Sequence, residues 1–530
     1  MTFVVDAGGT ASTEPFRDEP VGRDEMAVDD DAGRDDRRPG ADDERVGFHT
    51  VREELDTSVA VEGRLPPWLT GRFVRNGPGL FEAGGRSIDH WFDGPALLRA
   101  FGFEPGGPDG GEGRDSVRYV DRFLRTDAYA AAREGRVGAA GFAESDERGL
   151  LDRVRDLVPE PTDNANADVA RVAGATVALT ESPRAVRFDP ATLETVGELD
   201  WRDDLPAGHT TPHLKPDPDP DGSGHVGYLT TFLPRAGYRL FRVPADEPRR
   251  EEFARVPVDE PAYMHSLAVA DRFAVLVEPP FTIPPRRVLT GDGPLLDRYD
   301  WHPQRGTRFV VVDRETGAVV CEPRTPPFLA FHHANAYRDG DELVLDLVAF
   351  DSPSVLNAMY VEDLRARDGG GAGDLRRYRL PLSGATPRSE TLATDVAMPA
   401  VDDRRTGRRH RHVFAQRAAD GPATEVVRID VTGGVRSWTA DTYVSEPVFV
   451  PRPATGDRDG GSETADPGGD PGGAEPPPTP DGAVLVEVLD PDRERSAVVV
   501  LDAAEMTELA RAWAPHALPF GFHGAYFGGK

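Results

Sequence analysis

The sequence predicts an all-β fold, and most simply a β-propeller. Short runs of β-branched and aromatic residues recur along the chain, turn residues rich in Asp, Gly and Pro separate them, and helical patterns are rare; examples of such runs are GRFVRNGP, SVRYVDRFLR, HVGYLTTF, ELVLDLVAF and SAVVVLD. More than a dozen such strands in about 480 residues, without long alternating helices, favour a propeller over a sandwich or a parallel sheet. Six to seven four-stranded blades would use that length.

One segment reads as a helix. Residues 503–513 follow Asp502, a capping residue, and Glu505 stands three positions later, as in a capping box. Apolar residues at helical spacing would form one face of this segment, and we expect that face to consist of Met506, Leu509, Ala510 and Trp513.

The chain divides into a tail and one long domain. Residues 1–45 are rich in charge and glycine and poor in apolar residues, so we expect a disordered acidic tail ahead of a domain over residues 46–530. Segments 104–115, 367–374 and 452–482 have the same composition and read as surface insertions, the last of them disordered.

The charge of the chain restricts its partners. The 530 residues carry a net charge of −31, so a surface that follows nucleic-acid phosphates is disfavoured. Lys occurs only at Lys215 and Lys530, and Arg supplies the other basic residues. An acidic, Lys-poor surface is typical of a protein of a halophilic archaeon, because concentrated salt screens its self-repulsion. A GC-rich genome that favours Arg codons is the alternative explanation.

Cysteine content and hydropathy narrow the class further. With Cys321 as the only cysteine, neither a disulfide scaffold nor a zinc site made of cysteines can form. No stretch approaches the roughly 18 apolar residues of a membrane-spanning helix, and the first residues do not read as a signal peptide. We therefore expect a cytoplasmic protein, with peripheral attachment to a membrane as the open alternative.

Four of the thirteen histidines stand apart from the rest. His213, His265, His332 and His523 each border an apolar or aromatic run, where an uncharged imidazole would be buried. Among the others, the RRHRH segment that holds His410 and His412 is expected to be a solvated strand or turn, and polar surroundings are found at His49, His209, His225, His302 and His516. Taken singly, each of the four could equally be a core histidine bonded to a carbonyl.

The spacing of these four histidines limits the kind of metal site. Separations of 52, 67 and 191 residues exclude a zinc finger and an HExxH helix, which need local spacing. A propeller axis brings distant segments to one point, since one strand of every blade faces the central channel. Four neutral imidazoles suit a divalent first-row metal, and with open positions Fe(II) could bind dioxygen.

The order of motifs resembles that of the carotenoid cleavage oxygenases, especially the β-carotene cleaving oxygenases and the retinal pigment epithelium isomerohydrolase. The resemblance runs from about residue 46 to 527, and it rests on GRFVRNGP with HWFDGPALL, TDNANADV, ALTESP, TPHLKPDP, YMHSLAVADRFAVLVEPP, FHHANAYRDGDELVLDL, SEPVFVPRP and LPFGFHGAYF. It implies a seven-bladed propeller with a helical and loop dome over an axial Fe(II) and a hydrophobic tunnel that reaches the metal.

The resemblance assigns the metal ligands. TPHLKPD, MHS, FHHANAY and FGFHG place them at His213, His265, His332 and His523, with His209 as a competitor for His213 and His333 as a neighbour of His332.

The resemblance also implies supporting carboxylates. The family's glutamates fall on Glu181 and Glu446, which by analogy orient the imidazoles of His265 and His523. A third falls on Ala397, which leaves His332 without its expected partner. Arg338 and Arg99 also depart from the family pattern.

The resemblance implies a dioxygenase that cleaves a conjugated double bond of a carotenoid or apocarotenoid with O2, giving aldehydes, and retinal from β-carotene is the expected case. Peripheral membrane contact is expected, since the substrate dissolves in bilayers. Two rival functions remain open. A stilbene or phenylpropanoid oxygenase would want Tyr and Lys at the site, and Lys215 is the only internal Lys. A non-catalytic carotenoid-binding propeller would not need all four histidines.

Overall fold

A computed structural model describes residues 46–528, except for residues 85, 107–113, 136–161, 207, 219–223, 291–293, 367–370, 419–421 and 454–474. The predicted acidic tail, residues 1–45, and most of the predicted insertion, residues 452–482, lie outside the described residues. Within the described part of the chain, no helix is both long and apolar enough to cross a membrane.

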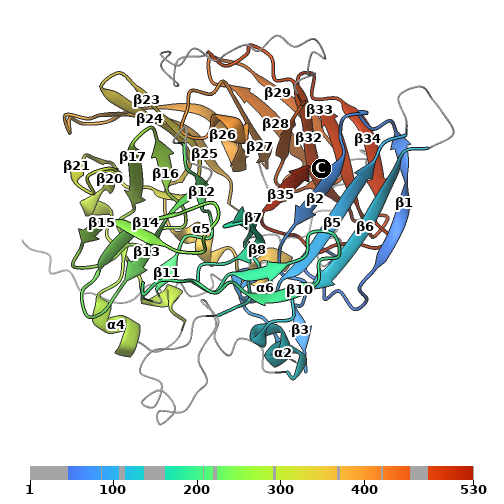
Figure 1. Cartoon of the computed structure of the whole chain (residues 1–530), viewed down its shortest axis with the longest axis horizontal. Helices are drawn as coiled ribbons and strands as arrows, with labels where there is room; N and C mark the ends of the chain where they lie inside the picture. The colour runs from blue at the N-terminus through green and yellow to red at the C-terminus, as the bar shows by residue number, and fades with distance from the viewer. Residues whose placement is uncertain are drawn as a thin grey trace, which may run out of the picture. The chain divides into compact units, whose positions relative to one another are not determined.

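The predicted all-β architecture is confirmed, and the sheets are arranged around a common centre (Figure 1). The first three sheets contain β7 (Asp168–Val172), β8 (Ala175–Leu179), β9 (Val186–Phe188) and β10 (Thr195–Glu198); β11 (His209–Thr210), β12 (Lys215–Pro216), β13 (His225–Thr231), β14 (Gly237–Val243) and β15 (Glu251–Pro257); and β16 (Ala268–Ala270), β17 (Phe273–Glu278), β20 (Thr307–Asp313), β21 (Val319–Cys321) and β22 (Arg324–Thr325).

The next sheet has seven strands: β23 (Leu329–Asp339), β24 (Glu342–Phe350), β25 (Gly373–Pro381), β26 (Arg388–Ala400), β27 (His412–Arg417), β28 (Glu425–Asp430) and β29 (Val435–Thr439). Strand β26 pairs with β25 through Arg388–Val396 and with β27 through Val396–Ala400, so two groups of strands merge into one sheet. The seven-blade count therefore stays a prediction.

The two ends of the domain close the ring together. In the ten-stranded sheet, β34 pairs with β1 and β35 pairs with β2. Its strands are β30 (Tyr443–Val444), β31 (Val448–Pro451), β32 (Gly482–Asp490), β33 (Arg495–Asp502), β34 (Glu508–Trp513), β1 (Asp56–Gly63), β6 (Ser116–Phe123), β5 (Leu97–Glu104), β2 (Gly71–Arg75) and β35 (Gly524–Gly528). This pairing of the first and last strands fixes the segment that carries His523.

Short elements complete the described chain. Two small two-stranded sheets and a few brief helices connect the larger sheets: β3 (Glu82–Ala83), β4 (Arg86–Ser87), β18 (Phe281–Thr282), β19 (Asp300–Trp301), α2 (Asp127–Arg133), α4 (Pro285–Thr290), α5 (Ser354–Asn357), α6 (Val361–Arg365) and the 3-10 turns η1 (Trp91–Asp93), η2 (Leu296–Arg298), η3 (Pro303–Arg305) and η4 (Asp403–Arg405). One apolar cluster joins α5 to strands β23, β24 and β27 through Leu356, Phe331, Phe350 and Val413.

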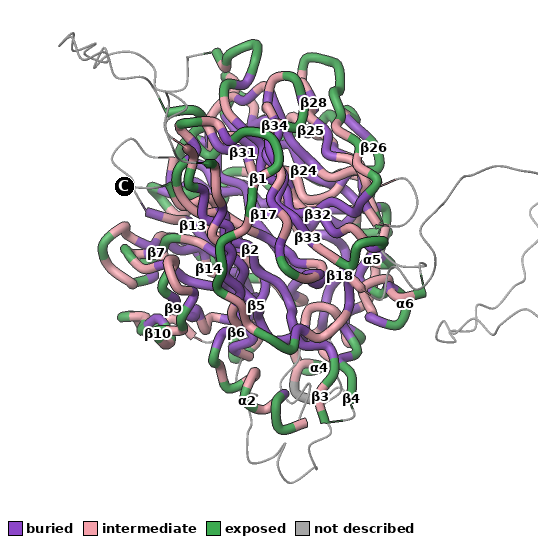
Figure 2. Tube along the Cα trace, turned by 90° about the vertical axis from the view of Figure 1, so that its right-hand side faces the viewer, coloured by how far each residue is buried: buried purple, intermediate pink, exposed green. Residues whose placement is uncertain are grey.

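The apolar core lies between neighbouring sheets, and most strands in Figure 2 are buried along much of their length. Val275 of β17 and Leu345 of β24 belong to one such cluster, and Tyr228 of β13 and Leu276 of β17 belong to the next. Strand β24 reads ELVLDLVAF, in which every residue after the first is buried. A strand covered by a sheet on each face needs such a continuous apolar run rather than an alternating one.

The helix predicted over residues 503–513 is wrong. The carboxylate of Asp502 accepts the N–H groups of Ala504 and Glu505, but these bonds close a turn, which ends at Met506 with φ of 54°. The next residues form β34, in which Ala510 and Ala512 are buried at a spacing of two. An Asp that satisfies N–H groups two and three residues later is common to helix starts and turns, which explains the error.

The buried His90 makes stability depend on pH. Its Nε2–H donates to the carbonyl of Leu356 and its Nδ1 accepts the N–H of Phe92, each at 3.2 Å, so the ring is neutral. Burial lowers the pKa of His90 from 6.5 to about 4.

Because the unfolded ring binds a proton at higher pH than the folded one, stability falls as pH drops from 6.5 to about 4. Over this pH range, His90 accounts for a loss of about 3 kcal/mol in the free energy of unfolding. Urea unfolding at constant salt should show that the parent loses stability between pH 7 and pH 4, and that His90→Gln loses less, by about the amount that His90 accounts for. Parallel pH profiles for the two proteins would contradict this assignment.

Candidate metal centre

The four predicted histidines meet at one point, although they come from four segments of the chain. His213 lies between β11 and β12, His265 lies shortly before β16, His332 is in β23, and His523 directly precedes β35. One ring nitrogen of each lies within 4.8 Å of the corresponding nitrogens of the others. His332 lies near the start of β23, and the other three histidines lie just before a strand. In a radial arrangement of sheets, such strand starts converge at the centre.

Carboxylates hold three of the four imidazoles. Glu181 Oε1 lies 2.5 Å from His265 Nδ1, and Glu446 Oε1 lies 2.7 Å from His523 Nδ1, which are the contacts expected from the sequence. The third carboxylate was not anticipated: Asp168 Oδ2, at the start of β7, lies 2.8 Å from His213 Nδ1. Asp168 is part of the TDNANADV motif, whereas the family pattern assigns the supporting carboxylates to glutamates in other motifs.

The tautomers of these rings favour a cation between them. An ionised carboxylate only accepts, so the Nδ1 atoms of His213 and His265 carry the protons and each Nε2 presents a lone pair. These two Nε2 atoms face each other at 3.0 Å, and the Nε2 of His332 is buried without a hydrogen-bond partner. Lone pairs that converge in this way repel one another unless a positive ion lies between them, so the residues fit a divalent metal.

The surroundings of the histidines disfavour their protonation, so a proton is a poor candidate for the positive charge between the rings. Burial, followed by the neighbouring imidazoles, lowers the pKa of His213 and of His332 well below the ordinary value. Burial raises the pKa of Asp168 to about 6, so this carboxyl is still mostly ionised at neutral pH. For Glu181, burial is outweighed by His209, His265 and Tyr263, which together lower its pKa.

Neither rival histidine is part of the cluster. His333 turns to Ser266, whose Oγ lies 2.6 Å from His333 Nδ1. His209 is buried with its Nε2 3.8 Å from Glu181 Oε1. The only internal lysine, Lys215, donates from Nζ to the carbonyl of His333 at 3.3 Å.

The three departures from the family pattern have different surroundings. Ala397 is in β26 opposite Gln416, and its methyl group offers no acceptor to an imidazole. The family resemblance predicts that Ala397→Glu would restore a carboxylate for His332 and tighten metal binding. Arg338 is exposed and pairs with Asp271 at 3.3 Å, away from the cluster.

Arg99 is fully buried and forms a two-pronged ion pair with Glu487, at 2.7 and 2.8 Å. A second buried pair lies close by and supports the metal centre: Arg75 Nη1 donates to Glu446 Oε2 at 2.8 Å, and the N–H of Gly524 donates to the same oxygen at 3.0 Å. Glu446 therefore holds His523 with one oxygen while its other oxygen is fixed.

Aromatic rings line the cluster. The ring of Phe92 is stacked on that of His265 with centroids 6.5 Å apart, and Phe331 meets the same ring edge-on at 5.5 Å. Phe522 packs edge-on against Phe92. The side-chain amides of Asn164 and Asn166 each donate to the carbonyl of Phe92 at 2.8 Å, which fixes the position of this residue. The histidines thus border an apolar wall that would exclude water.

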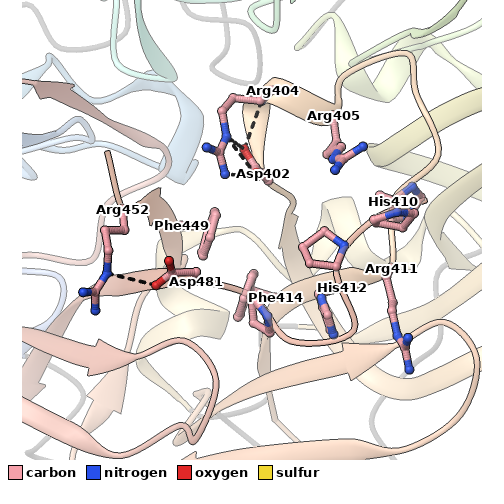
Figure 3. A pocket seen from close by; sticks show the side chains of 13 residues that line it. Asp402, Arg404, Arg405, His410, Arg411, His412, Phe414, Phe449, Arg452 and Asp481 are labelled. Atoms are coloured by element: carbon pink, nitrogen blue, oxygen red, sulfur yellow. Dashed lines mark hydrogen bonds and ion pairs between the residues drawn. The ribbon is translucent and has the colours of Figure 1, made fainter. Parts of the chain in front are cut away.

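The expectation that the RRHRH segment is solvated is wrong. His410 and His412 are both buried, at 3% and 7% exposure. His410 Nε2 lies 2.7 Å from Asp346 Oδ2. The two rings line a pocket of about 140 Å³ that shares no residue with the four-histidine cluster (Figure 3). Four arginines are part of its wall, and two of them, Arg404 and Arg452, are paired with the carboxylates of Asp402 and Asp481.

Sequence comparisons find relatives along nearly the whole chain. The profile of the family described as "Retinal pigment epithelial membrane protein" matches residues 48–528. A rice protein (Oryza sativa subsp. japonica) named carotenoid cleavage dioxygenase 8 homolog A is 30% identical over 514 residues, covering 90% of this chain and 86% of that protein. Human β,β-carotene 15,15'-dioxygenase is 26% identical, with 90% of this chain and 93% of that protein covered.

Solved structures match as well. A variant of the Synechocystis apocarotenoid oxygenase has a TM-score of 0.77 at 25% identity, covering 92% of this chain and 99% of that one. A cobalt-substituted form of the Synechocystis protein has a TM-score of 0.76 at 24% identity with the same coverage. The propeller fold of the chain is thus shared with these structures.

Proposed function

The chain belongs to the family of retinal pigment epithelial membrane protein and the carotenoid cleavage oxygenases. We propose that it is a dioxygenase of this family that uses Fe(II) to cleave a conjugated double bond of a carotenoid or apocarotenoid. The observation that carries the proposal is the convergence of four imidazoles, three of them buried and that of His332 partly buried, in which the Nε2 atoms of His213 and His265 face each other at 3.0 Å.

The metal would be held by His213, His265, His332 and His523. Bound there, Fe(II) would supply the one-electron chemistry that O2 needs to react with a closed-shell alkene. The remaining work falls to the chain. Glu181 and Glu446 keep the protons of their histidines on Nδ1, and the aromatic wall keeps the reacting bond dry.

The reaction is balanced without any other reactant. The double bond and one O2 are converted into two carbonyl groups, one oxygen atom on each carbon, and no proton enters or leaves. The described cluster accordingly needs no general base.

β-Carotene, giving retinal, is the substrate we propose to test first, because a human relative is named for the cleavage of that compound. A phenolic stilbene is the second candidate. An oxygenase for it would want Tyr and Lys at the site, and Lys215, which donates to the carbonyl of His333 at 3.3 Å, is the only internal lysine.

Two further proposals concern the surroundings of the enzyme. The substrate is insoluble in water, so we propose that the chain collects it by peripheral contact with a membrane. The net charge of −31 supports a working environment of high salt. The cytoplasmic location stays a prediction.

The reaction can be tested with labelled oxygen. Protein loaded anaerobically with Fe(II) is mixed with β-carotene or an apocarotenal in detergent and then exposed to ¹⁸O2. The aldehyde products are reduced at once to alcohols, because a carbonyl oxygen exchanges with water and an alcohol oxygen does not. Mass spectrometry should then show two fragments, each with one ¹⁸O atom. Fragments that carry label on one side only would contradict the proposed dioxygenase, and so would an absence of cleavage of both carotenoid classes by the iron-loaded protein.

A further inference from the structure

The supporting carboxylates are distributed over the histidines in a way that the sequence did not predict. The sequence placed them at Glu181, Glu446 and, in relatives, at the position of Ala397. The chain instead has a carboxylate at Asp168, and this carboxylate contacts His213 rather than His332. Three carboxylates still surround the four imidazoles, so the negative charge that would balance a divalent ion is kept.

Asp168 is held in place from several sides. Its Oδ1 accepts the N–H of Val169 at 2.8 Å, and its main-chain carbonyl accepts the side-chain amide of Asn76 at 3.1 Å. It begins β7, in which it pairs with Leu179 of β8. These contacts fix both the backbone of Asp168 and its Oδ1, and they leave Oδ2 directed at His213 Nδ1.

The same segment also fixes a second histidine. The carbonyl of Ala167 accepts the N–H of His523 at 3.1 Å, and the N–H of Asn76 donates to the carbonyl of His523 at 2.9 Å. The start of β7 therefore contacts the imidazole of His213 through a side chain and the main chain of His523 through the backbone. A side-chain change at residue 168 would act on His213 while the backbone contact to His523 remains.

We propose that Asp168 is a positioning residue of the metal centre, whose negative charge fixes the tautomer of His213 and strengthens this imidazole as a ligand, and that it takes the place of the carboxylate missing at Ala397. The inference rests on the proposed metal site. A carboxylate that accepts the outer N–H of a ligating imidazole raises the basicity of the nitrogen facing the metal, and loss of such a partner costs about 10–100-fold in metal affinity.

The test measures binding of Co²⁺ by the metal-free full-length protein, in competition with a fluorescent chelator, so it does not depend on activity. Asp168→Asn keeps the size and an acceptor oxygen but removes the charge, and we expect its Co²⁺ affinity to fall about 10–100-fold. The visible absorption of the cobalt-loaded protein should change as well, because the ligand field of His213 weakens. Asp168→Glu keeps the charge and should recover part of the affinity.

Asp163 provides the matched control in the same motif. It is buried too, but its oxygens accept the N–H groups of Asp127 and Ala128 at the start of α2, so Asp163→Asn should leave both the Co²⁺ affinity and the spectrum unchanged.

The outcomes separate this inference from the proposed function. Parent-like affinity and spectrum in Asp168→Asn would overturn the role of Asp168 while the metal site itself stands. Should Asp168→Asn not fold, the inference is judged on Asp168→Glu, whose spectrum must then differ from that of the parent, since the longer side chain moves the carboxylate relative to His213. A parent protein that binds no Co²⁺ at all would overturn the proposed metal site.

Discussion

Replacing any one of His213, His265, His332 or His523 by alanine is expected to abolish retention of iron or turnover. Each change removes a ligand nitrogen, so the loss in metal affinity should exceed the roughly 10–100-fold that follows from losing a partner outside the ligand set. Iron is measured after gel filtration of anaerobically loaded protein, and turnover by O2 uptake with carotenoid. Within the described residues, carboxylates contact only the other three imidazoles of the cluster, so the His332 variant should keep the largest residual affinity.

Two neighbouring histidines give matched controls for this series. His209 and His333 are both buried and lie four residues before His213 and directly after His332, but neither is part of the cluster. His209→Ala and His333→Ala should therefore retain iron close to the parent level. An active His213→Ala protein with a full complement of iron would show that the assignment of this ligand is wrong.

Removal of Glu487 is expected to cost about 3–5 kcal/mol of unfolding free energy, because it leaves the buried guanidinium of Arg99 without its counter-charge. The pair joins β5 to β32 within the sheet that closes the ring, and the exposure of the two side chains is 0% and 6%. Arg75 lies in the electric field of both groups, so the loss of Glu487 also leaves two buried cations close together. Urea unfolding of Glu487→Leu at fixed salt measures the effect.

A double variant tests the cause of that loss. Arg99→Met with Glu487→Leu removes both charges and should recover most of the stability, since well-packed apolar side chains can replace a buried ion pair at little cost. Asp56→Asn breaks the exposed pair with Arg118 and should change stability little. If Glu487→Leu were no less stable than Asp56→Asn, then the buried pair would not be a structural requirement.

The strands and the meeting of the four histidines could be predicted from the sequence, each for its own reason. Runs such as ELVLDLVAF are dense in β-branched and apolar residues, and this signal is local, so β24 was recognisable. The histidines were found from motifs that carry a family resemblance, while their spacing alone allowed only a metal site of distant ligands.

Other features depended on long-range geometry or on ambiguous local signals. The contact between Asp168 and His213 spans 45 residues, and no local pattern sets which imidazole a carboxylate will reach. His410 and His412 lie among arginines in the sequence, but the fold buries both beside Asp346 and Asp430. Residues 503–513 have the capping residue and the apolar spacing of a helix, so local sequence could not distinguish a helix from a turn followed by a strand. Pairing of β34 with β33 and β1 selects the strand.

The most direct test of the metal centre is X-ray absorption at the iron edge of the protein loaded anaerobically with one equivalent of Fe(II). The four-histidine arrangement predicts scattering from four imidazole rings in the parent and in His209→Ala, and from fewer rings in any of the four alanine variants that still holds iron. A spectrum that contains two imidazoles or fewer, or one that His213→Ala leaves unchanged, would contradict the account.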